Sequence, residues 1–576
     1  MAIDPGNSIS TASDLGTLSV QKLKNQIGKT DRFDFYRFTL TGSSNFKAQL
    51  RGLKASADMA LLSNSGTLLQ QNKKPGKQNE AINTALAAGT YYVRIKGGNQ
   101  TTPYRLNLFA TGTSISNTAP VLSGSLALNA LRGSLTASST AIGSSSLNAT
   151  DSQQAANQLT YTITTAPKSG SVYRSGVLLS VGNTFTQADV NSGLISYQQQ
   201  AIKVLPNSTG IASAPVISGK NAAWVSGTGT SAEVYFYNGT TGVTTQLTSN
   251  SREDTEVQIS GNTVVWSAVY SSTDTDIQYS VNGAAPVTVN DRANFNDFSP
   301  QISGNSIAFK RNDNSGTNVA GDGVYLYDIG TGTTTQVRGD VESVYSIGVS
   351  GANVVWERDF GSESDIQYRL SGSTFQAVNE STSLEDYSPL ISGSYIAFKR
   401  NDLGGSNVAG DGIYLYNTST LTTTQLSTGT EDVYLGGISG NNVVWQRFYT
   451  SGSEGDIFYS LNGSTAVNTI NTSTAFDDYS PRISGTNIAF VRDDKSGTSN
   501  DGVHLFDTST SSITRLSANA ADAIGGIDGK NLAWRSGSSS SAQAFFYDGT
   551  TTSDSFGFTV SDGSLSTSGM LNITIG

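Results

Sequence analysis

Aspartates recur at one position of a repeated pattern in this 576-residue chain. Each lies five residues before an isoleucine, and the set is Asp254, Asp297, Asp386, Asp478 and Asp522. Repeat symmetry would gather such carboxylates around one end of a ring, at the mouth of a central channel. There they could hold a hard cation or, as a suitably spaced pair, hydrolyse a glycoside. Catalysis needs one asymmetric pair, however, and aspartates that cap a turn are the simpler interpretation.

Two loops place further acidic and amide side chains across a glycine-rich hairpin. Each runs from an Arg-Asn-Asp segment to an Asp-Gly pair, and the candidate calcium ligands are Asp313, Asn318, Asp322, Asp402, Asn407 and Asp411. Oxygens of Asp and Asn are suitable ligands for Ca²⁺. The spacing does not match an EF-hand loop, and an ordered loop in which aspartate pairs with arginine would have the same sequence. Ca²⁺ is therefore the one cofactor that the sequence suggests.

Side chains that usually perform nucleophilic or acid–base chemistry are scarce. The chain has no cysteine and one histidine, His504, which excludes disulfides, Cys–His catalysis and multi-histidine metal sites. His504 takes the place of Tyr325 and Tyr414 in sister repeats, so we interpret it as a strand-packing residue. No nucleophile elbow or phosphate-binding loop precedes a helical pattern. We expect no enzyme; the alternative is a carbohydrate-active hydrolase or lyase that uses Asp386 or Asp478.

The elements that position these side chains repeat every 42–47 residues. The tripeptide Ile/Val-Ser/Asp-Gly starts at Ile217, Ile259, Ile302, Val349, Ile391, Ile438, Ile483 and Ile527. Seven residues after each start comes one large aromatic residue: Trp224, Trp266, Phe309, Trp356, Phe398, Trp445, Phe490 and Trp534. Each unit has four short strand patterns. Together, four strands and this period predict a β-propeller in which the aromatics pack between neighbouring blades.

Two kinds of unit alternate, which favours an even number of blades. From Ile259 to Ile483, units with a Val-Val-Trp strand alternate with units that have an Ile-Ala-Phe strand. We therefore expect eight blades, with seven as the alternative. The last unit lacks its fourth strand, and residues 201–205 have the pattern of that missing strand. We expect this segment to close the ring, which would remove two exposed strand edges.

The sequence predicts an all-β protein of three domains, and their charges differ. Residues 1–113 form an N-terminal β-sandwich with a net charge of +8, and residues 201–550 form the propeller with a net charge of −17. Residues 119–200 plus 551–576 form a split sandwich. Such charge asymmetry often marks an interaction surface, and faces that only keep the protein soluble are the alternative. An acidic propeller argues against nucleic acid as a partner.

The repeat units resemble the TolB-type propeller family. The matching residues in one unit are Asp386-Tyr-Ser-Pro-Leu-Ile391-Ser-Gly and Ile413-Tyr-Leu-Tyr416. This resemblance specifies a fold and is silent on function, because such blades serve binding and catalysis alike.

The N-terminal segment resembles the bacterial pre-peptidase C-terminal domain. It does so through Asp34-Phe-Tyr36-Arg-Phe38 and Gly89-Thr-Tyr-Tyr-Val-Arg94. The resemblance implies an extracellular accessory module.

Residues 119–200 resemble the first part of a chondroitin-sulfate-proteoglycan-type, cadherin-like repeat. They do so through Leu159-Thr-Tyr-Thr-Ile163 and the segment from Phe185 to Tyr197. The strand that normally follows within a few residues appears only at 554–563, so we expect the propeller to be inserted in a surface turn of this sandwich. Alternatively, strands in residues 555–576 complete the sandwich of a neighbouring copy.

These resemblances are typical of secreted multidomain surface proteins of bacteria, cyanobacteria among them. We expect an extracellular or cell-surface structural and binding protein with the propeller as its interaction platform. Its partners would be envelope glycans, surface proteins or further copies of itself, joined by strand exchange or opposite charges into a fibre or surface layer. No apolar stretch is long enough to cross a membrane, and the first residues lack the usual signal-peptide pattern, so export would follow another route.

Overall fold

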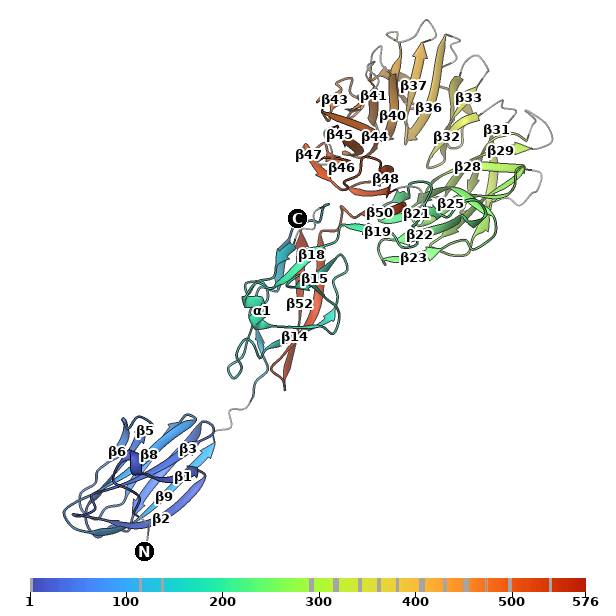
Figure 1. Ribbon diagram of the computed structural model, residues 1–576. Helices are drawn as coiled ribbons and strands as arrows, with labels where there is room; N and C mark the ends of the chain where they lie inside the picture. The colour runs from blue at the N-terminus through green and yellow to red at the C-terminus, as the bar shows by residue number, and fades with distance from the viewer. Residues whose placement is uncertain are drawn as a thin grey trace. The chain divides into compact units, whose positions relative to one another are not determined.

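The computed structural model is built almost entirely of β-strands (Figure 1). It describes residues 4–112, 117–135, 139–289, 295–313, 321–339, 344–359, 364–379, 383–402, 410–427, 432–448, 455–471, 473, 475–495, 500–537 and 541–576. In these ranges the only α-helix is the five-residue α1 (Gln187–Asn191), so no described helix is long and apolar enough to span a membrane. The all-β class is therefore confirmed. The chain divides into two compact units, Met1–Thr118 and Ala119–Gly576.

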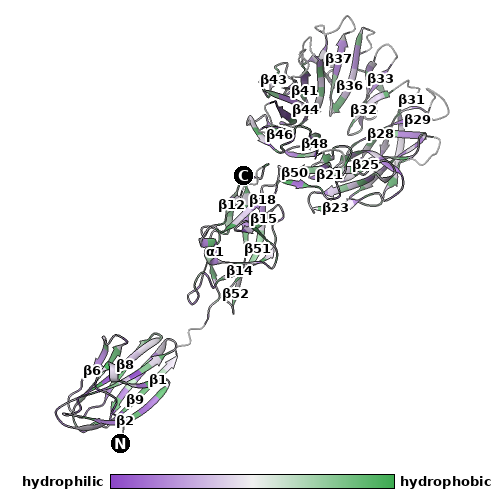
Figure 2. Cartoon of the chain, viewed as in Figure 1, coloured by the Kyte–Doolittle hydropathy of each residue, from purple (hydrophilic) through white to green (hydrophobic). Residues whose placement is uncertain are grey.

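The first unit is a sandwich of two sheets. One has the order β1 (Ser13–Thr17), β3 (Phe33–Leu40), β8 (Gly89–Gly97), β5 (Ala57–Ser63), β6 (Leu68–Asn72). The other has the order β2 (Val20–Ile27), β9 (Thr102–Gly112), β4 (Ser44–Arg51), β7 (Glu80–Leu86). Buried and exposed residues alternate along β4, as expected for a sheet with one solvated face, and Phe38 stacks on Phe46 in the core. Hydrophilic and hydrophobic residues are both visible along the strands of this unit (Figure 2).

The second unit contains another sandwich, which is built from both ends of the unit. One sheet has the order β11 (Ala127–Ala130), β52 (Ser566–Ile575), β51 (Ser553–Ser561), β14 (Thr160–Thr165), β17 (Thr184–Thr186). The other has the order β12 (Ser139–Ala141), β18 (Ile195–Gln199), β15 (Gly170–Arg174), β16 (Val177–Leu179). Phe556 and Phe558 of β51 are buried beside Tyr161. In the structure, the two C-terminal strands therefore pair within their own chain.

Eight four-stranded blades form the rest of the unit, and we number them in chain order. The first strands are β20 (Val216–Ser218), β24 (Glu253–Ser260), β28 (Phe295–Ser303), β32 (Val344–Ser350), β36 (Leu384–Ser392), β40 (Asp432–Ser439), β44 (Phe476–Ser484) and β48 (Ala523–Asp528). The second strands are β21 (Asn221–Ser226), β25 (Thr263–Ser271), β29 (Ser306–Asp313), β33 (Asn353–Asp359), β37 (Tyr395–Asp402), β41 (Asn442–Phe448), β45 (Asn487–Asp494) and β49 (Asn531–Ser536). The third strands are β22 (Glu233–Asn238), β26 (Asp274–Val281), β30 (Gly323–Asp328), β34 (Ser364–Arg369), β38 (Gly412–Asn417), β42 (Gly455–Ser460), β46 (Gly502–Asp507) and β50 (Gln543–Tyr547).

The fourth strands include the segment that closes the ring. In blades 1 to 7 they are β23 (Val243–Gln246), β27 (Val287–Thr288), β31 (Thr333–Gly339), β35 (Phe375–Ala377), β39 (Thr422–Gln425), β43 (Asn468–Thr469) and β47 (Ser512–Arg515). In blade 8 the fourth strand is β19 (Ile202–Val204), which pairs antiparallel with β50. The prediction of an eight-bladed propeller closed by residues 201–205 is therefore confirmed.

The repeated Ser-Gly turn is explained by hydrogen bonds between blades. The glycine of each turn donates its N–H to the serine hydroxyl of the preceding blade, as Gly304 does to Ser260 and Gly351 to Ser303, both at 2.9 Å. At the closure, Gly219 donates to Asp528 Oδ2 at 2.6 Å, so the chain of eight bonds is complete. All eight glycines have φ of 58–60°, a left-handed conformation that side chains disfavour.

The eight repeat aromatics pack at the contacts between blades. Each is at most 1 % exposed. Trp266 of blade 2, for example, lies in one cluster with Ala223 and Phe236 of blade 1, and Trp445 of blade 6 packs with Ile413 of blade 5. Each aromatic thus fills the space between its own blade and the one before, which is the place expected from the sequence.

Candidate functional site

Three of the five repeat aspartates form buried ion pairs with arginines. Asp297 accepts from Arg311 Nε at 2.6 Å and from Nη2 at 2.7 Å, a bidentate geometry, and its side chain is fully buried. The same pair recurs in Asp386–Arg400 and Asp478–Arg492. Arg311 and Arg400 begin the two Arg-Asn-Asp segments described from the sequence, and Arg492 begins the corresponding Arg-Asp-Asp segment of blade 7. The repeat aspartates and these arginines, which belong to separate features of the sequence, are therefore partners in the same structural ion pairs.

A β-bulge brings each of these pairs into register. In blade 3, Ile302 pairs with Ile307, but the ladder shifts between Phe298 and Gln301, so that Asp297 faces Arg311. Ser299 lies in the bulge with φ 55°. Its N–H donates to Glu256 Oε2 of the preceding blade at 2.7 Å.

Aromatic rings enclose the paired guanidinium groups. The Cζ atom of Arg311 lies 4.4 Å from the ring centroid of Phe295, 4.3 Å from that of Tyr325 and 5.5 Å from that of Phe309. Burial disfavours the charge of Arg311, but the hydrogen bonds and the charge of Asp297 outweigh it, so the pKa of Arg311 lies above its usual value. Carboxylate and rings together form a guanidinium cage.

The other two repeat aspartates have no such arginine. Asp254 accepts from Asn250 Nδ2 at 2.9 Å, and its second oxygen has no hydrogen-bond partner. Neither carboxylate oxygen of Asp522 has a partner in good hydrogen-bond geometry, although the side chains of Ser517, Asn519 and Ser536 lie near it. Burial raises the pKa of both carboxyl groups. All five aspartates are at most 4 % exposed, so their carboxylates are enclosed and are not open to solvent as carboxylates at a channel mouth would be.

Most of the proposed calcium ligands cannot be placed. Asn318 and Asn407 lie outside the described residues, as do the side chains of Asp313 and Asp402. Of the remaining two, Asp322 is buried and Asp411 is partly buried. Calcium binding at these loops therefore stays a prediction.

His504 is a packing residue of β46. Its ring stacks on Phe490 with centroids 5.4 Å apart, and Nδ1 lies 2.9 Å from the carbonyl oxygen of Gly502. Burial lowers the pKa of His504 to about 4, so the imidazole is neutral near neutral pH.

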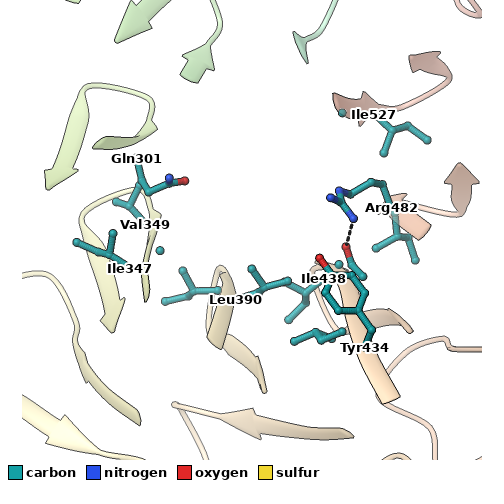
Figure 3. Close-up of a pocket in the computed structure, with 15 residues that line it drawn as sticks. Gln301, Ile347, Val349, Leu390, Tyr434, Ile438, Arg482 and Ile527 are labelled. Carbon is teal, nitrogen blue, oxygen red and sulfur yellow. Dashed lines mark hydrogen bonds between the residues drawn. The ribbon is translucent and has the colours of Figure 1, made fainter. Parts of the chain in front are cut away.

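A cavity of about 420 Å³ lies among the first strands of the ring (Figure 3). Ile347, Leu390 and Ile438 contribute aliphatic side chains to its wall, and polar atoms form at least as much of the wall's surface as apolar atoms do. Arg482 and Tyr434 are the large polar side chains that line it. Arg482 Nη1 donates to the carbonyl oxygens of Pro481 and Gly436, at 2.9 and 3.4 Å.

Exposed aromatic side chains collect at one end of the ring. We call this the loop end, and it lies opposite the Ser-Gly turns, where the first strands begin and the second strands end. Tyr270, Tyr345, Tyr434 and Phe448 are all 42–59 % exposed there. Tyr434 also lines the cavity, so the aromatic surface continues into the ring. Aromatic residues are enriched in binding interfaces. Tyr345 and Tyr434 share one repeat position, four residues before Val349 and Ile438, whereas Tyr270 and Phe448 occupy other positions.

The N-terminal unit has an acidic cluster that the sequence did not reveal. Asp4, Asp31 and Asp34 each bring one carboxylate oxygen within 4.8 Å of the others. Asp34 is fully buried and accepts a hydrogen bond from Tyr104, while its Oδ1 has no partner. Burial raises the pKa of Asp34 to about 7. Such an oxygen cluster suits a hard cation such as Ca²⁺. The close spacing of Asp31 and Asp34 is visible in the sequence, but Asp4 comes near them only when the unit folds.

The chain is similar in structure to several solved proteins. A prolyl endopeptidase is 11 % identical with a TM-score of 0.39, and the match covers 53 % of this chain and 52 % of that one, so the chain spans about half its length. The β-propeller domain of the Trilobed protease from Pyrococcus furiosus is 11 % identical over 51 % of this chain and 95 % of that one, with a TM-score of 0.38. An oligogalacturonate lyase in complex with manganese is 10 % identical over 50 % and 85 %, with a TM-score of 0.34.

Sequence comparison identifies two of the modules. No curated protein matches the chain. Residues 126–206 match the model of the cadherin-like family, and residues 32–97 match that of the bacterial pre-peptidase C-terminal domain. The chain thus combines a pre-peptidase C-terminal domain with a cadherin-like domain, whose last strands follow the propeller.

Proposed function

We propose that this chain is an extracellular binding protein whose propeller is a rigid platform with the loop end as its binding surface. The cadherin-like and pre-peptidase C-terminal modules indicate a binding or structural role. The observation that carries the proposal is the distribution of side chains in the ring. Three repeat aspartates are paired with arginines inside the blades, whereas exposed aromatic side chains lie at the loop end, and one of them, Tyr434, lines the cavity.

The partner would be a component of a bacterial envelope, either a glycan or a surface protein. Exposed tyrosines offer rigid, amphipathic contact area at a low cost in side-chain entropy. The experiment measures binding of the labelled protein to isolated envelope fragments. Tyr345→Ser and Tyr434→Ser should weaken binding, whereas Phe375→Ser, which removes an exposed aromatic near the Ser-Gly turns, should not. Equal loss in all three variants would contradict a binding surface at the loop end.

Assembly of copies would rest on charge. Residues 1–113 and 201–550 carry opposite net charges of +8 and −17, and attraction between them is screened by salt. Sedimentation at low and high salt tests this. Copies should associate at low salt and separate at high salt, and a monomer in both at high protein concentration would contradict assembly.

We infer that the platform does not catalyse. The carboxylates that a glycoside hydrolase would need are held inside blades by the ion pairs Asp386–Arg400 and Asp478–Arg492. A screen of glycan hydrolysis and elimination tests this, with Asp386→Asn and Asp478→Asn as variants. Turnover that either variant abolishes while the fold is retained would overturn the inference.

A further inference from the structure

Blade 8 lacks the arginine that fills the guanidinium cage in blades 3, 5 and 7. The ladder of blade 8 pairs Ala523 with Arg535, just as that of blade 3 pairs Phe298 with Lys310. One residue further along each ladder, Asp297 faces Arg311, and the corresponding positions in blade 8 are Asp522 and Ser536. The carboxylate is thus retained, and the long cationic side chain is replaced by a short hydroxyl.

The aromatic wall of the cage is retained as well. In blade 3, the wall includes Phe309 and Tyr325, which stack at 5.7 Å with an interplanar angle of 21°. In blade 8, Trp534 and Phe545 take these positions and stack at 5.5 Å and 14°. Indole has the strongest cation–π attraction of the aromatic side chains, so this wall suits a cation at least as well.

Open space replaces the missing side chain. A cavity of about 490 Å³ is lined by Trp534, Ser536 and Phe545, by residues 516–519, and by Ser134, Leu135 and residues 198–202. Three of its lining residues, Ser517, Asn519 and Ser536, also lie close enough to Asp522 to lower the pKa of that carboxyl, against the larger effect of burial. Asp522 does not line the cavity itself, but three side chains that line it interact with its carboxyl group.

Buried polar atoms around the cavity lack partners. Neither oxygen of Asp522 meets a donor in good hydrogen-bond geometry, although Ser517, Asn519 and Ser536 lie near it; the indole N–H of Trp534 and the Nε2 of Gln199 are buried without a hydrogen bond. A buried carboxylate held only by such weak contacts is unfavourable, and a cation with N–H donors would relieve it. Arg515 does not fill this role, since its Nε donates to the carbonyl oxygens of Asp501 and Ser517.

We propose that this cavity binds a guanidinium group, supplied by an arginine side chain of a partner or by a free guanidino compound. A planar guanidinium presents two parallel N–H donors to one carboxylate and stacks on aromatic rings, as the three internal arginines do. A calcium ion needs six or more oxygen ligands, and a single carboxylate does not provide them. The cavity is larger than the guanidinium, so it has room for the attached alkyl chain.

Calorimetry with Nα-acetyl-arginine amide tests the proposal on the full chain. It should bind saturably, and the citrulline and lysine analogues should bind at least tenfold more weakly because they lack the charged planar fork. A tripeptide with central arginine and agmatine distinguish the two sources: tighter binding of the peptide indicates a protein partner, and tighter binding of agmatine a free compound. No binding of any guanidino probe, or equal binding of citrulline, would overturn the proposal.

Three variants separate ligand binding from a merely water-filled gap. Ser536→Arg supplies an internal guanidinium, so it should abolish probe binding and raise the melting temperature. Ser226→Arg is the matched control in blade 1, where Ala212 stands in place of the aspartate, and it should do neither. Asp522→Asn should abolish binding while the near-ultraviolet circular dichroism is kept. Unchanged probe binding by the Ser536→Arg variant would refute the proposed site. A lower melting temperature of that variant would show that blade 8 does not accommodate a guanidinium as blades 3, 5 and 7 do.

Discussion

Asp297→Asn should destabilise the propeller far more than the equivalent substitution in blade 2. The substitution removes the negative charge of the carboxylate to which Arg311 donates two short hydrogen bonds. The positively charged guanidinium then remains buried among aromatic rings. Removing one partner of a buried ion pair costs about 3–5 kcal/mol. Asp254 is the matched control, because it holds the same strand position and is fully buried but has no arginine. Asp254→Asn removes a buried carboxylate that no arginine pairs with, so stability should be unchanged or higher.

Urea unfolding followed by tryptophan fluorescence measures this effect. All five tryptophans lie in the blades, so the signal reports on the propeller and not on either sandwich. The double variant Asp297→Leu/Arg311→Met replaces both charges by apolar groups of similar size and should recover most of the lost stability. A loss below about 1 kcal/mol for Asp297→Asn, or an equal loss for Asp254→Asn, would refute the role assigned to these pairs.

Three further outcomes are expected. Ca²⁺ should raise the melting temperature of the N-terminal unit within the full chain, and Asp34→Asn should remove that increase. Calorimetry measures both. The same calcium effect in the unmodified protein and in the Asp34→Asn variant would exclude the cluster of Asp4, Asp31 and Asp34 as its cause. His504 has a folded-state pKa of about 4 against 6.5 when unfolded, so the unfolded state takes up the proton first and propeller stability should fall as the pH drops from about 6.5 to 4. Substituting His504→Tyr, as in the sister blades, should flatten this part of the urea-midpoint profile, and an unchanged slope would contradict it. Ser303→Ala removes one bond of the Ser–Gly ring and should cost about 1 kcal/mol in urea unfolding. Ser373→Ala is its control, because that exposed hydroxyl lies outside the ring and should cost less; equal costs would argue against a special role for the ring.

The period of the repeat was sufficient to predict the blades, their number and the closing strand. Burial of one aromatic per unit enforces a strict spacing, and that spacing is visible in the sequence. The partners of the aspartates were not predictable in the same way. In an unbroken ladder continuing from Ile302 and Ile307, Asp297 would face Asn312, and only the bulge at Ser299 turns it toward Arg311. A one-residue shift changes which side chains share a face, and the sequence carries no clear mark of it.

Two other features depend on contacts that are distant in sequence. Asp4 reaches Asp31 and Asp34 only through the folding of the N-terminal unit. Tyr345 and Tyr434 share a repeat position that is aromatic in other blades as well, and their exposure depends on packing that periodicity does not reveal. The departure of Ser536 from the arginine of sister blades, by contrast, is visible in the aligned repeats, and its meaning follows once the ion pairs are known.

The insertion of the propeller between β18 and β51 has a mechanical consequence. A pull applied between residues 127 and 576 loads β11 and β52, and these strands are parallel neighbours paired from Ala127–Asn572 to Ala130–Ile575. Pulled at opposite ends, two parallel strands load their hydrogen bonds together in shear instead of one at a time. The propeller lies outside that line of force and keeps its shape until the sandwich yields. A protein held under flow would thus keep its platform intact, with the two-strand joint as the element that bears the tension.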